Sequence, residues 1–260
     1  MDALLWNVNR KDPGPILDSL IAQLSADIVV IPECPRSAKA PAGYVRLTTP
    51  YSALTIFSKR KSSRLIAEDP SERFVAVSHT PSSVTIIGCH LLSKLHGSDE
   101  DSFTAAGRLR HFIESIETQV GHDRTVVLGD MNMDPFENGM VHCDGLHAVM
   151  TRHIATRGTR TVQRAERKFF YNPMWSHYGD SRETAPATYF YASSKSRAYF
   201  WHMYDQILIR PILIPTLVTV SILESAGQTV LVDAEHKPLT AISDHLPVSV
   251  TLDSLRLAAT

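Results

Sequence analysis

Short apolar runs of strand length recur along the whole chain, and their Val and Ile content is typical of buried strands. These runs cover residues 3–6, 28–31, 54–57, 75–77, 84–87, 126–128, 207–209 and 248–252. Two other segments have helical spacing, with apolar faces formed by Ile16, Leu17, Leu20, Ile21 and Leu24, and by Leu109, Phe112, Ile113, Ile116 and Val120. Many strands with few, well-separated helices predict layered sheets with helices packed outside them.

No internal repeat, low-complexity tract or linker divides this pattern, so we expect a single domain over residues 1–260. Hydrophobic residues make up 43% and charged residues 20% of the chain, which excludes a disordered, collagen-like or disulfide-scaffold protein. Lys plus Arg number 26 and Asp plus Glu 27, giving a net charge of −1. Nucleic-acid binding would therefore require a local basic patch.

The three cysteines (Cys34, Cys89 and Cys143) are odd in number and far apart, so we expect no disulfide framework, no disulfide-linked partner and no structural zinc site. No stretch reaches the length of a membrane span, and the first residues lack a secretory signal. These features predict a cytoplasmic protein without membrane insertion.

Polar residues are concentrated at the ends of the predicted strands. Those that follow a strand are Asn7, Glu33, His90, Asp130 and Asn132, and those that precede one are Asp205, Asp244 and His245. In antiparallel pairing the end of one strand lies beside the start of its neighbour. We therefore expect all eight side chains to gather at one edge of the sheets and form one pocket.

Such a pocket would contain the carboxylates of Glu33, Asp130, Asp205 and Asp244, whose mutual repulsion a cation would relieve. Carboxylate and amide oxygens favour a hard ion such as Mg²⁺ or Mn²⁺. The chain has no zinc-binding H-E-x-x-H and no P-loop, dinucleotide-binding or α/β-hydrolase motif. With two histidines added, the constellation is suited to attack of water on a phosphate ester.

Six short motifs lie at or beside these strand ends: W-N at 6–7, P-E at 32–33, C-H-L at 89–91, G-D-M-N at 129–132, Y-D-Q-I-L at 204–208 and S-D-H-L-P-V at 243–248. In kind and in order these motifs resemble those of the endonuclease/exonuclease/phosphatase superfamily. The resemblance covers nearly the whole chain. It implies an α/β fold, a four-layer α/β/β/α sandwich of two mixed, mostly antiparallel sheets flanked by helices.

The resemblance also implies a metal site. Glu33 would be the main magnesium ligand, with Asn7 beside it and Asp244 completing the shell. Pro32 stands where glutamine is commonest before the metal-binding glutamate, a departure that leaves the ligand itself in place.

Catalytic roles carried over in the same way concern five further residues. Asp130 would orient or deprotonate the attacking water, and Asn132 would hold the phosphate and stabilise the transition state. His245, paired with Asp205, would contact the scissile phosphate or act as the base. His90 would be the general acid for the leaving oxygen. Taken singly, each of these residues has a structural alternative, as a turn residue or a satisfied core histidine.

Three more residues are candidates for substrate binding: Lys94, Trp201 and His202. Between residues 151 and 168 there are six Lys or Arg against one acid, and a segment rich in aromatics follows up to residue 201. This region could hold a phosphate backbone and stack bases, or it could be a solvated loop followed by core aromatics.

The interpretation we adopt is a Mg²⁺-dependent phosphodiesterase, a nuclease that hydrolyses DNA or RNA by metal-assisted attack of water. The first alternative is a phosphatase or phosphodiesterase acting on a phospholipid head group or a small phosphorylated metabolite, which the near-neutral charge favours. The second is a catalytically silent binding module of the same fold.

Overall fold

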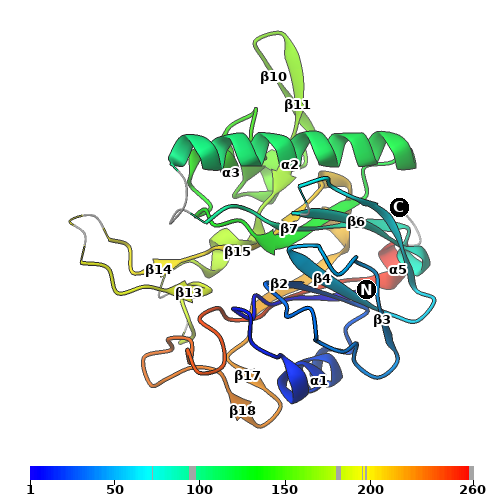
Figure 1. Ribbon diagram of the computed structural model, residues 1–260. Coiled ribbons are helices and arrows are strands. Elements are labelled where there is room, and N and C mark those ends of the chain that lie inside the picture. The colour runs from blue at the N-terminus through cyan, green and yellow to red at the C-terminus, as the bar shows by residue number, and fades with distance from the viewer. Residues whose placement is uncertain (72, 94–97, 180–182, 195, 197, 258–260) are drawn as a thin grey trace.

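The computed structural model describes residues 1–71, 73–93, 98–179, 183–194, 196 and 198–257. Two large sheets form its centre (Figure 1). The first has the strand order β16 (Leu217–Ile222), β19 (Val248–Leu252), β1 (Asp2–Leu5), β2 (Ile28–Pro32), β4 (Leu54–Lys59) and β3 (Tyr44–Arg46). The second has the order β5 (Ser63–Glu68), β6 (Phe74–His79), β7 (Val84–His90), β8 (Thr125–Asp130), β15 (Asp205–Ile209), β12 (Phe170–Tyr171) and β9 (Ala148–Val149).

Helices, 3₁₀ turns and two-stranded pairs make up the other regular elements of the described chain. The helices are α1 (Gly14–Leu24), α2 (Asp99–Val120), α3 (Asn138–Val141), α4 (Arg152–Ala155) and α5 (Ser254–Leu257), with 3₁₀ turns η1 (Thr80–Ser82), η2 (Pro173–His177) and η3 (Pro211–Thr216). The two-stranded pairs are β10 (Thr159–Val162) with β11 (Ala165–Lys168), β13 (Tyr189–Phe190) with β14 (Trp201–His202), and β17 (Ser225–Ala226) with β18 (Thr229–Val230). The first two pairs lie in hairpins that project from the body in different directions (Figure 1).

Most strand pairs are antiparallel, and the two longest helices account for two parallel ones. β1 runs parallel to β2 and β7 parallel to β8. Each of these pairs is joined by a long crossover that contains α1 or α2, because a parallel pair cannot be closed by a tight turn. The crossovers place α1 and α2 on opposite outer faces of the molecule (Figure 1).

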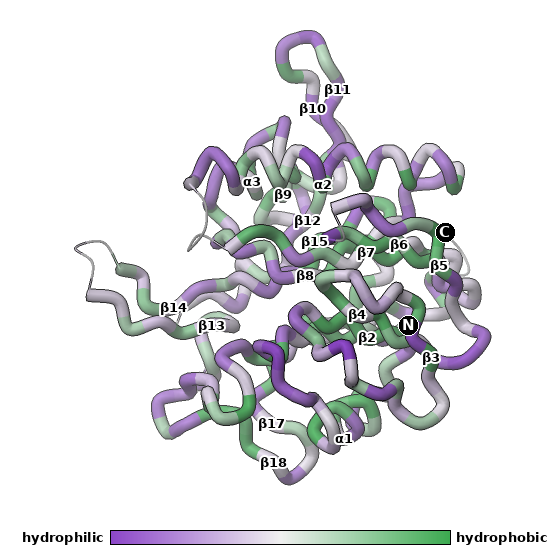
Figure 2. The backbone as a smooth tube through the Cα atoms, viewed as in Figure 1, coloured by the Kyte–Doolittle hydropathy of each residue, from purple (hydrophilic) through white to green (hydrophobic). Residues whose placement is uncertain are grey.

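Alternation of side chains along each strand separates three layers of core. Leu5 on β1 and Leu128 on β8 belong to the cluster between the two sheets, whereas Leu4 belongs to the cluster that includes Leu17 of α1. Val127 of β8 lies in the third cluster, which faces α2. Figure 2 shows the apolar strands between the more polar outer elements. The predicted four-layer α/β/β/α sandwich is confirmed.

Helix α2 is longer than its apolar face predicts, because its first turns are fixed by capping. Ser98 and Asp101 form a capping box in which each side chain accepts from the other residue's backbone N–H. At the other end Gly121 adopts the left-handed conformation (φ 77°) and donates its N–H to Glu117 O.

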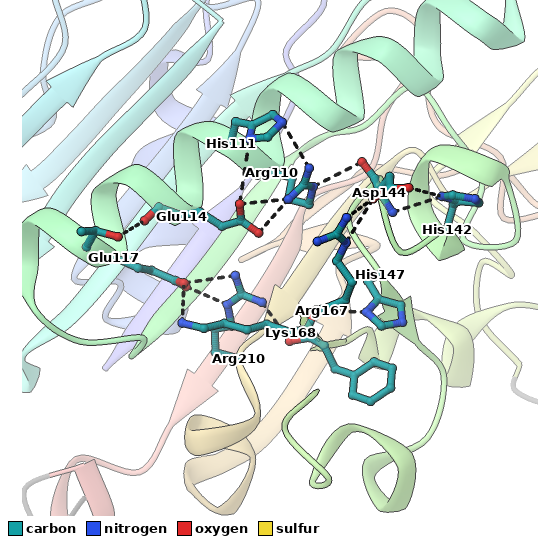
Figure 3. A network of polar contacts seen from close by, with 12 residues as sticks. Arg110, His111, Glu114, Glu117, His142, Asp144, His147, Arg167, Lys168 and Arg210 are labelled. Atoms are coloured by element: carbon teal, nitrogen blue, oxygen red, sulfur yellow. Dashed lines mark hydrogen bonds and ion pairs between the residues drawn. The ribbon is translucent and has the colours of Figure 1, made fainter. Parts of the chain in front are cut away.

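A buried ion pair fastens the last turn of α2 to the seven-stranded sheet (Figure 3). Arg210, directly after β15, donates to Glu117 from Nε at 2.7 Å and from Nη2 at 3.1 Å. Its Nη1 donates to Phe169 O at 3.0 Å, and its guanidinium lies 3.8 Å from the centre of the Phe170 ring. Every charged group of the pair is therefore matched inside the protein.

Within the ranges given above, no helix combines the length and the apolar character needed to cross a membrane. Cys34, Cys89 and Cys143 are free thiols, and burial raises the pKa of Cys34 and of Cys89. A buried, protonated thiol is unreactive.

Candidate active site

Strand register brings the predicted site residues to one edge of the seven-stranded sheet. The last residue of β8, Asp130, lies opposite the first residue of β15, Asp205. His90, at the end of β7, lies opposite Asp130 on the other side. The antiparallel and parallel pairings therefore collect three polar side chains at the same point, as the sequence predicts.

A glycine makes this approach possible. A Cβ atom at Gly129 would lie 2.2 Å from the carbonyl oxygen of Cys89 on the neighbouring strand. No side chain fits there, so the glycine of the G-D-M-N motif allows β7 and β8 to lie at the separation that places His90 beside Asp130.

The six-stranded sheet contributes the other half of the site. Asn7 follows β1 and donates from Nδ2 to Asp130 Oδ2 at 2.9 Å and to Glu33 Oε1 at 3.4 Å. His90 Nε2 lies 3.7 Å from Glu33 Oε1 and 3.8 Å from Asp130 Oδ2. Arg10 lies 3.2 Å from the second oxygen of Glu33. Asn7 thus joins the carboxylates of the two sheets.

Asp205 and His245 form a buried carboxylate–imidazole pair, with Nδ1 2.7 Å from Oδ2. Burial lowers the pKa of His245, but the negative charge and hydrogen bond of Asp205 outweigh it and raise that pKa to about 10, assisted by the charges of Asp130 and Asp244. Burial raises the pKa of Asp205, while the attraction of His245 opposes the rise. The contact with Asp205 fixes the orientation of the imidazole ring.

Hydrogen bonds tie the S-D-H segment to β1. His245 N donates to Ser243 Oγ, and Ser243 Oγ donates to Asn7 O, at 3.1 and 2.8 Å. Trp6 Nε1 donates to His245 O at 3.2 Å. The serine of this motif and the tryptophan before Asn7 therefore position other residues of the site.

Two site residues adopt left-handed backbone conformations. Glu33 has φ 53° and Asn132 has φ 48°. Asn132 N donates to Asp130 Oδ1 at 2.9 Å, and its Nδ2 donates to Leu91 O at 3.1 Å. Such conformations cost energy and occur often at functional sites. Here the hydrogen bonds of Asn132 with Asp130 and Leu91 accompany its unusual backbone.

The donor set fits a hard cation. Asp205 Oδ1 and Asp244 Oδ1 are buried and have no hydrogen-bond partner among the residues that the structure describes, and neither has His90 Nδ1. Potential ligand atoms of Asp130, Asp205 and His245 lie within 4.8 Å of one another. Buried carboxylate oxygens without a partner are costly unless a cation or substrate satisfies them.

These groups open into a cavity of about 440 Å³. Its lining includes six residues predicted from the sequence: Glu33, Asp130, Asn132, His202, Asp244 and His245. Asn7, His90 and Asp205 lie behind this lining and contact it. Lys94 lies outside the described residues.

Trp201 and His202 lie differently, although they are adjacent in sequence. Trp201 packs against two core clusters and against Phe190, with ring centres 5.2 Å apart. His202 lines the cavity, and its Nδ1 lies 2.8 Å from Asp134 Oδ2. Asp134, which the sequence analysis missed, also accepts from Met203 N at 2.8 Å.

The basic and aromatic segment is divided between two environments. Arg167 pairs with Asp144, and Lys168 with Glu117 and Asp123. Phe169 and Phe170 are core residues. Three later tyrosines of the segment line the cavity, namely Tyr189, Tyr191 and Tyr199, and so does Tyr204 just beyond it. One part of the segment therefore belongs to the core, and another part lines the cavity.

No protein-family description matches the sequence, and neither does any curated protein. Solved structures do match. An endonuclease/exonuclease/phosphatase family protein from Bacteroides thetaiotaomicron is 12% identical, with a TM-score of 0.59 over 96% of each chain. The chain has the fold of the endonuclease/exonuclease/phosphatase superfamily. The resemblance inferred from the motifs is confirmed at the level of the fold.

Two further structures with this fold match almost end to end. An AP endonuclease from Archaeoglobus fulgidus is 15% identical, with a TM-score of 0.57 over 97% of this chain and 99% of the other. A 3′ phosphatase from Neisseria, bound to a product DNA hairpin, is 18% identical, with the same TM-score over 97% of this chain and 99% of its own.

Proposed function

We propose that the protein is a metal-dependent phosphodiesterase that hydrolyses nucleic acid. One observation carries the proposal. Four carboxylates and two imidazoles from both sheets converge at one cavity, and two of the buried carboxylate oxygens have no partner among the described residues. This arrangement supports attack of water on a phosphate diester beside a hard cation.

Glu33, Asn7 and Asp244 would hold Mg²⁺ or Mn²⁺, which would neutralise charge on the phosphoryl oxygens. All three residues flank strands of the six-stranded sheet, and the contact of Asn7 with Glu33 supports this assignment. The orphaned Oδ1 of Asp244 supports it as well.

The remaining side chains would handle the water, the phosphate and the leaving oxygen. Asp130, fixed by Asn7 and by the backbone of Asn132, would orient the water and take its proton. Asn132 would stabilise the phosphate in the transition state. His245, as the imidazolium held by Asp205, would contact a phosphate oxygen. His90 would donate a proton to the leaving oxygen.

Nucleic acid is the substrate we favour, because tyrosines suited to contact bases line the same cavity. The match to a phosphatase structure bound to a DNA hairpin is compatible with this choice. The specific alternative is a small phosphoester, favoured by the net charge of −1 and by a described cavity lining that contains no Lys or Arg. Three free cysteines fit a cytoplasmic location, and a site built from both sheets fits a single domain over residues 1–260.

The test is hydrolysis of labelled single- and double-stranded DNA and RNA, and of bis(p-nitrophenyl) phosphate, with Mg²⁺, with Mn²⁺ and with EDTA. Asp130→Asn and His245→Gln should each lower the rate by about 10²–10⁴-fold. Glu235→Gln, at an exposed glutamate, is the matched control and should retain full activity. Cleavage of the small diester alone would favour the small-phosphoester alternative. No hydrolysis, together with no thermal stabilisation by Mg²⁺, would leave a silent binding module.

A further inference from the structure

One side of the cavity is built from rings that the proposed chemistry does not use. We call it the aromatic wall, and it consists of Tyr189, Tyr191, Tyr199, His202 and Tyr204. All five belong to the hairpin of β13 and β14 or directly follow it. Asp130 and His245 line the same cavity, so the wall lies beside the proposed site of phosphate attack.

The hairpin presents its two faces to different surroundings. Tyr189, Tyr191 and Ser193 are spaced by two along an extended segment, and all three line the cavity. Between them Phe190 packs against Trp201, which contacts the core. Alternation along the strand therefore places the tyrosines on the face of the hairpin that is turned to the cavity, and Phe190 on the other face.

The inner part of the wall is fixed by ring contacts. His202 and Tyr204 stack with ring centres 4.8 Å apart and an interplanar angle of 20°. Tyr189 stacks on Tyr204 at 5.3 Å and 27°, and it lies 4.7 Å from the ring of His245. The Asp134–His202 contact holds this stack in place.

The outer part of the wall is exposed. Tyr191 is 52% and Tyr199 is 46% accessible. Large aromatic rings at the mouth of a polar cavity are suited to a planar ligand whose faces stack and whose edges accept hydrogen bonds. Tyrosine hydroxyls, Ser193 and Asn9 supply polar atoms around the rings.

We propose that the aromatic wall stacks against an unpaired nucleobase adjacent to the scissile phosphate, so that the substrate is a single strand or an unpaired end. Inside a duplex both faces of each base are covered by neighbouring bases, so a base within the chain can offer a face to a tyrosine ring only when it is out of the stack. This inference deepens the proposed function and rests on it for the position of the phosphate.

Binding is measured by fluorescence anisotropy in EDTA, so that hydrolysis does not interfere. The probes are a labelled thymidine oligonucleotide, the same backbone with abasic tetrahydrofuran units, and the duplex with its complement. The variants are Tyr191→Ala, Tyr199→Ala and the two Tyr→Phe changes. Tyr51→Ala, at a tyrosine that is 65% exposed and does not line the cavity, is the matched control.

The single strand should bind between about fivefold and about a hundredfold more tightly than the abasic strand. Each alanine variant should remove most of this preference, whereas the phenylalanine variants and Tyr51→Ala should keep it. Equal binding of base-bearing and abasic strands would overturn the proposal. So would tighter binding of the duplex, or a preference that survives both alanine changes.

A second readout separates this proposal from the proposed function. The p-nitrophenyl ester of thymidine monophosphate carries a base, and methyl p-nitrophenyl phosphate does not. If the protein hydrolyses both esters and the alanine variants change neither rate, the base-stacking proposal is refuted and the proposed phosphodiesterase activity stands. Base-dependent binding without hydrolysis of either ester, or of the DNA and RNA substrates above, would refute the proposed phosphodiesterase and leave the base-stacking proposal. A rise in KM that the alanine variants show for the thymidine ester, and not for the methyl ester, supports both proposals.

Discussion

Nδ1 of His202 lies 2.8 Å from Oδ2 of Asp134, so the cavity contains a second carboxylate–imidazole pair besides Asp205 and His245. The two pairs have different settings. Tyr204 stacks on His202, whereas His245 lies next to Asp244 in the S-D-H segment. The Asp134–His202 pair therefore organises the aromatic wall, and the Asp205–His245 pair belongs to the proposed chemistry.

Replacing His202 tests that structural role. His202→Phe keeps a ring for stacking on Tyr204 but removes the partner of Oδ2 of Asp134, a residue that is only 1% exposed. We expect a loss of about 1–3 kcal/mol in the free energy of unfolding, measured by urea denaturation. His236→Phe is the matched control, because His236 pairs with Glu224 at 3.0 Å but its side chain is 42% exposed. An equal loss in the two variants would contradict the role of Asp134.

Asp205→Asn should change the titration of His245. The charge of Asp205 keeps the imidazole protonated against the effect of burial, and its removal should lower the pKa of His245 well below the wild-type value of about 10. NMR of the histidine ring in metal-free protein measures this. Hydrolysis should fall by about 10²–10⁴-fold in the same variant. Asp18→Asn, at an exposed aspartate of α1, should change neither quantity, and an unaltered His245 titration in Asp205→Asn would rule out the pairing.

Breaking the buried ion pair between Glu117 and Arg210 should cost more stability than breaking a partly exposed pair on the same helix. Glu117→Gln leaves a buried guanidinium without its counter-charge, and we expect a loss of about 3–5 kcal/mol in urea unfolding. Glu114→Gln removes the pair with Arg110, in which the glutamate is 39% exposed, and should cost no more than about 1 kcal/mol. Comparable losses would mean that burial of the pair is unimportant.

Two buried histidines should make the protein less stable in mild acid. Burial lowers the pKa of His79 and of His147, so the unfolded chain, with a pKa near about 6.5, takes up protons first as the pH falls. The free energy of unfolding in EDTA should therefore decrease below about pH 6.5. His245, with its raised pKa, acts in the opposite sense, because its contribution is present below about pH 6.5 and is lost toward about pH 10.

Comparison of variants isolates the effect of His79. His79→Gln should reduce the acid slope of the unfolding free energy. His111→Gln, at a side chain that is 71% exposed, should leave the slope unchanged. Both proteins retain His245, so its opposite contribution cancels in the comparison. An unchanged slope in His79→Gln would show that its protonation is not linked to folding.

The sequence predicted the layers and the meeting point of Asp130 with Asp205, because strand alternation and strand ends are local signals. It could not predict the Asp134–His202 contact, which joins residues 68 positions apart with no pattern that relates them. The aromatics were visible, but separating the core residue Phe170 from the exposed wall residue Tyr191 requires knowledge of the hairpin's two faces.

The hairpin of β10 and β11 was missed for a different reason. Its two central residues, Gln163 and Arg164, both have positive φ angles, of 49° and 67°. Such turns are usually marked by Asn or Gly, and neither residue occurs here. A basic segment without that marker looks like a loop in the sequence.

The candidate site is divided between the two sheets, with Asn7 and Glu33 on one and His90 and Asp130 on the other. The proposed hydrolysis needs both halves, so hydrolytic activity would report on the docking of the two sheets. A change in the central core that lets one sheet slide against the other should abolish this activity while each sheet is still folded. Tyr191 and Tyr199 of the β13–β14 hairpin, by contrast, line the cavity but belong to neither large sheet, so they can change with less effect on that alignment and are a natural place for new substrate preferences to arise.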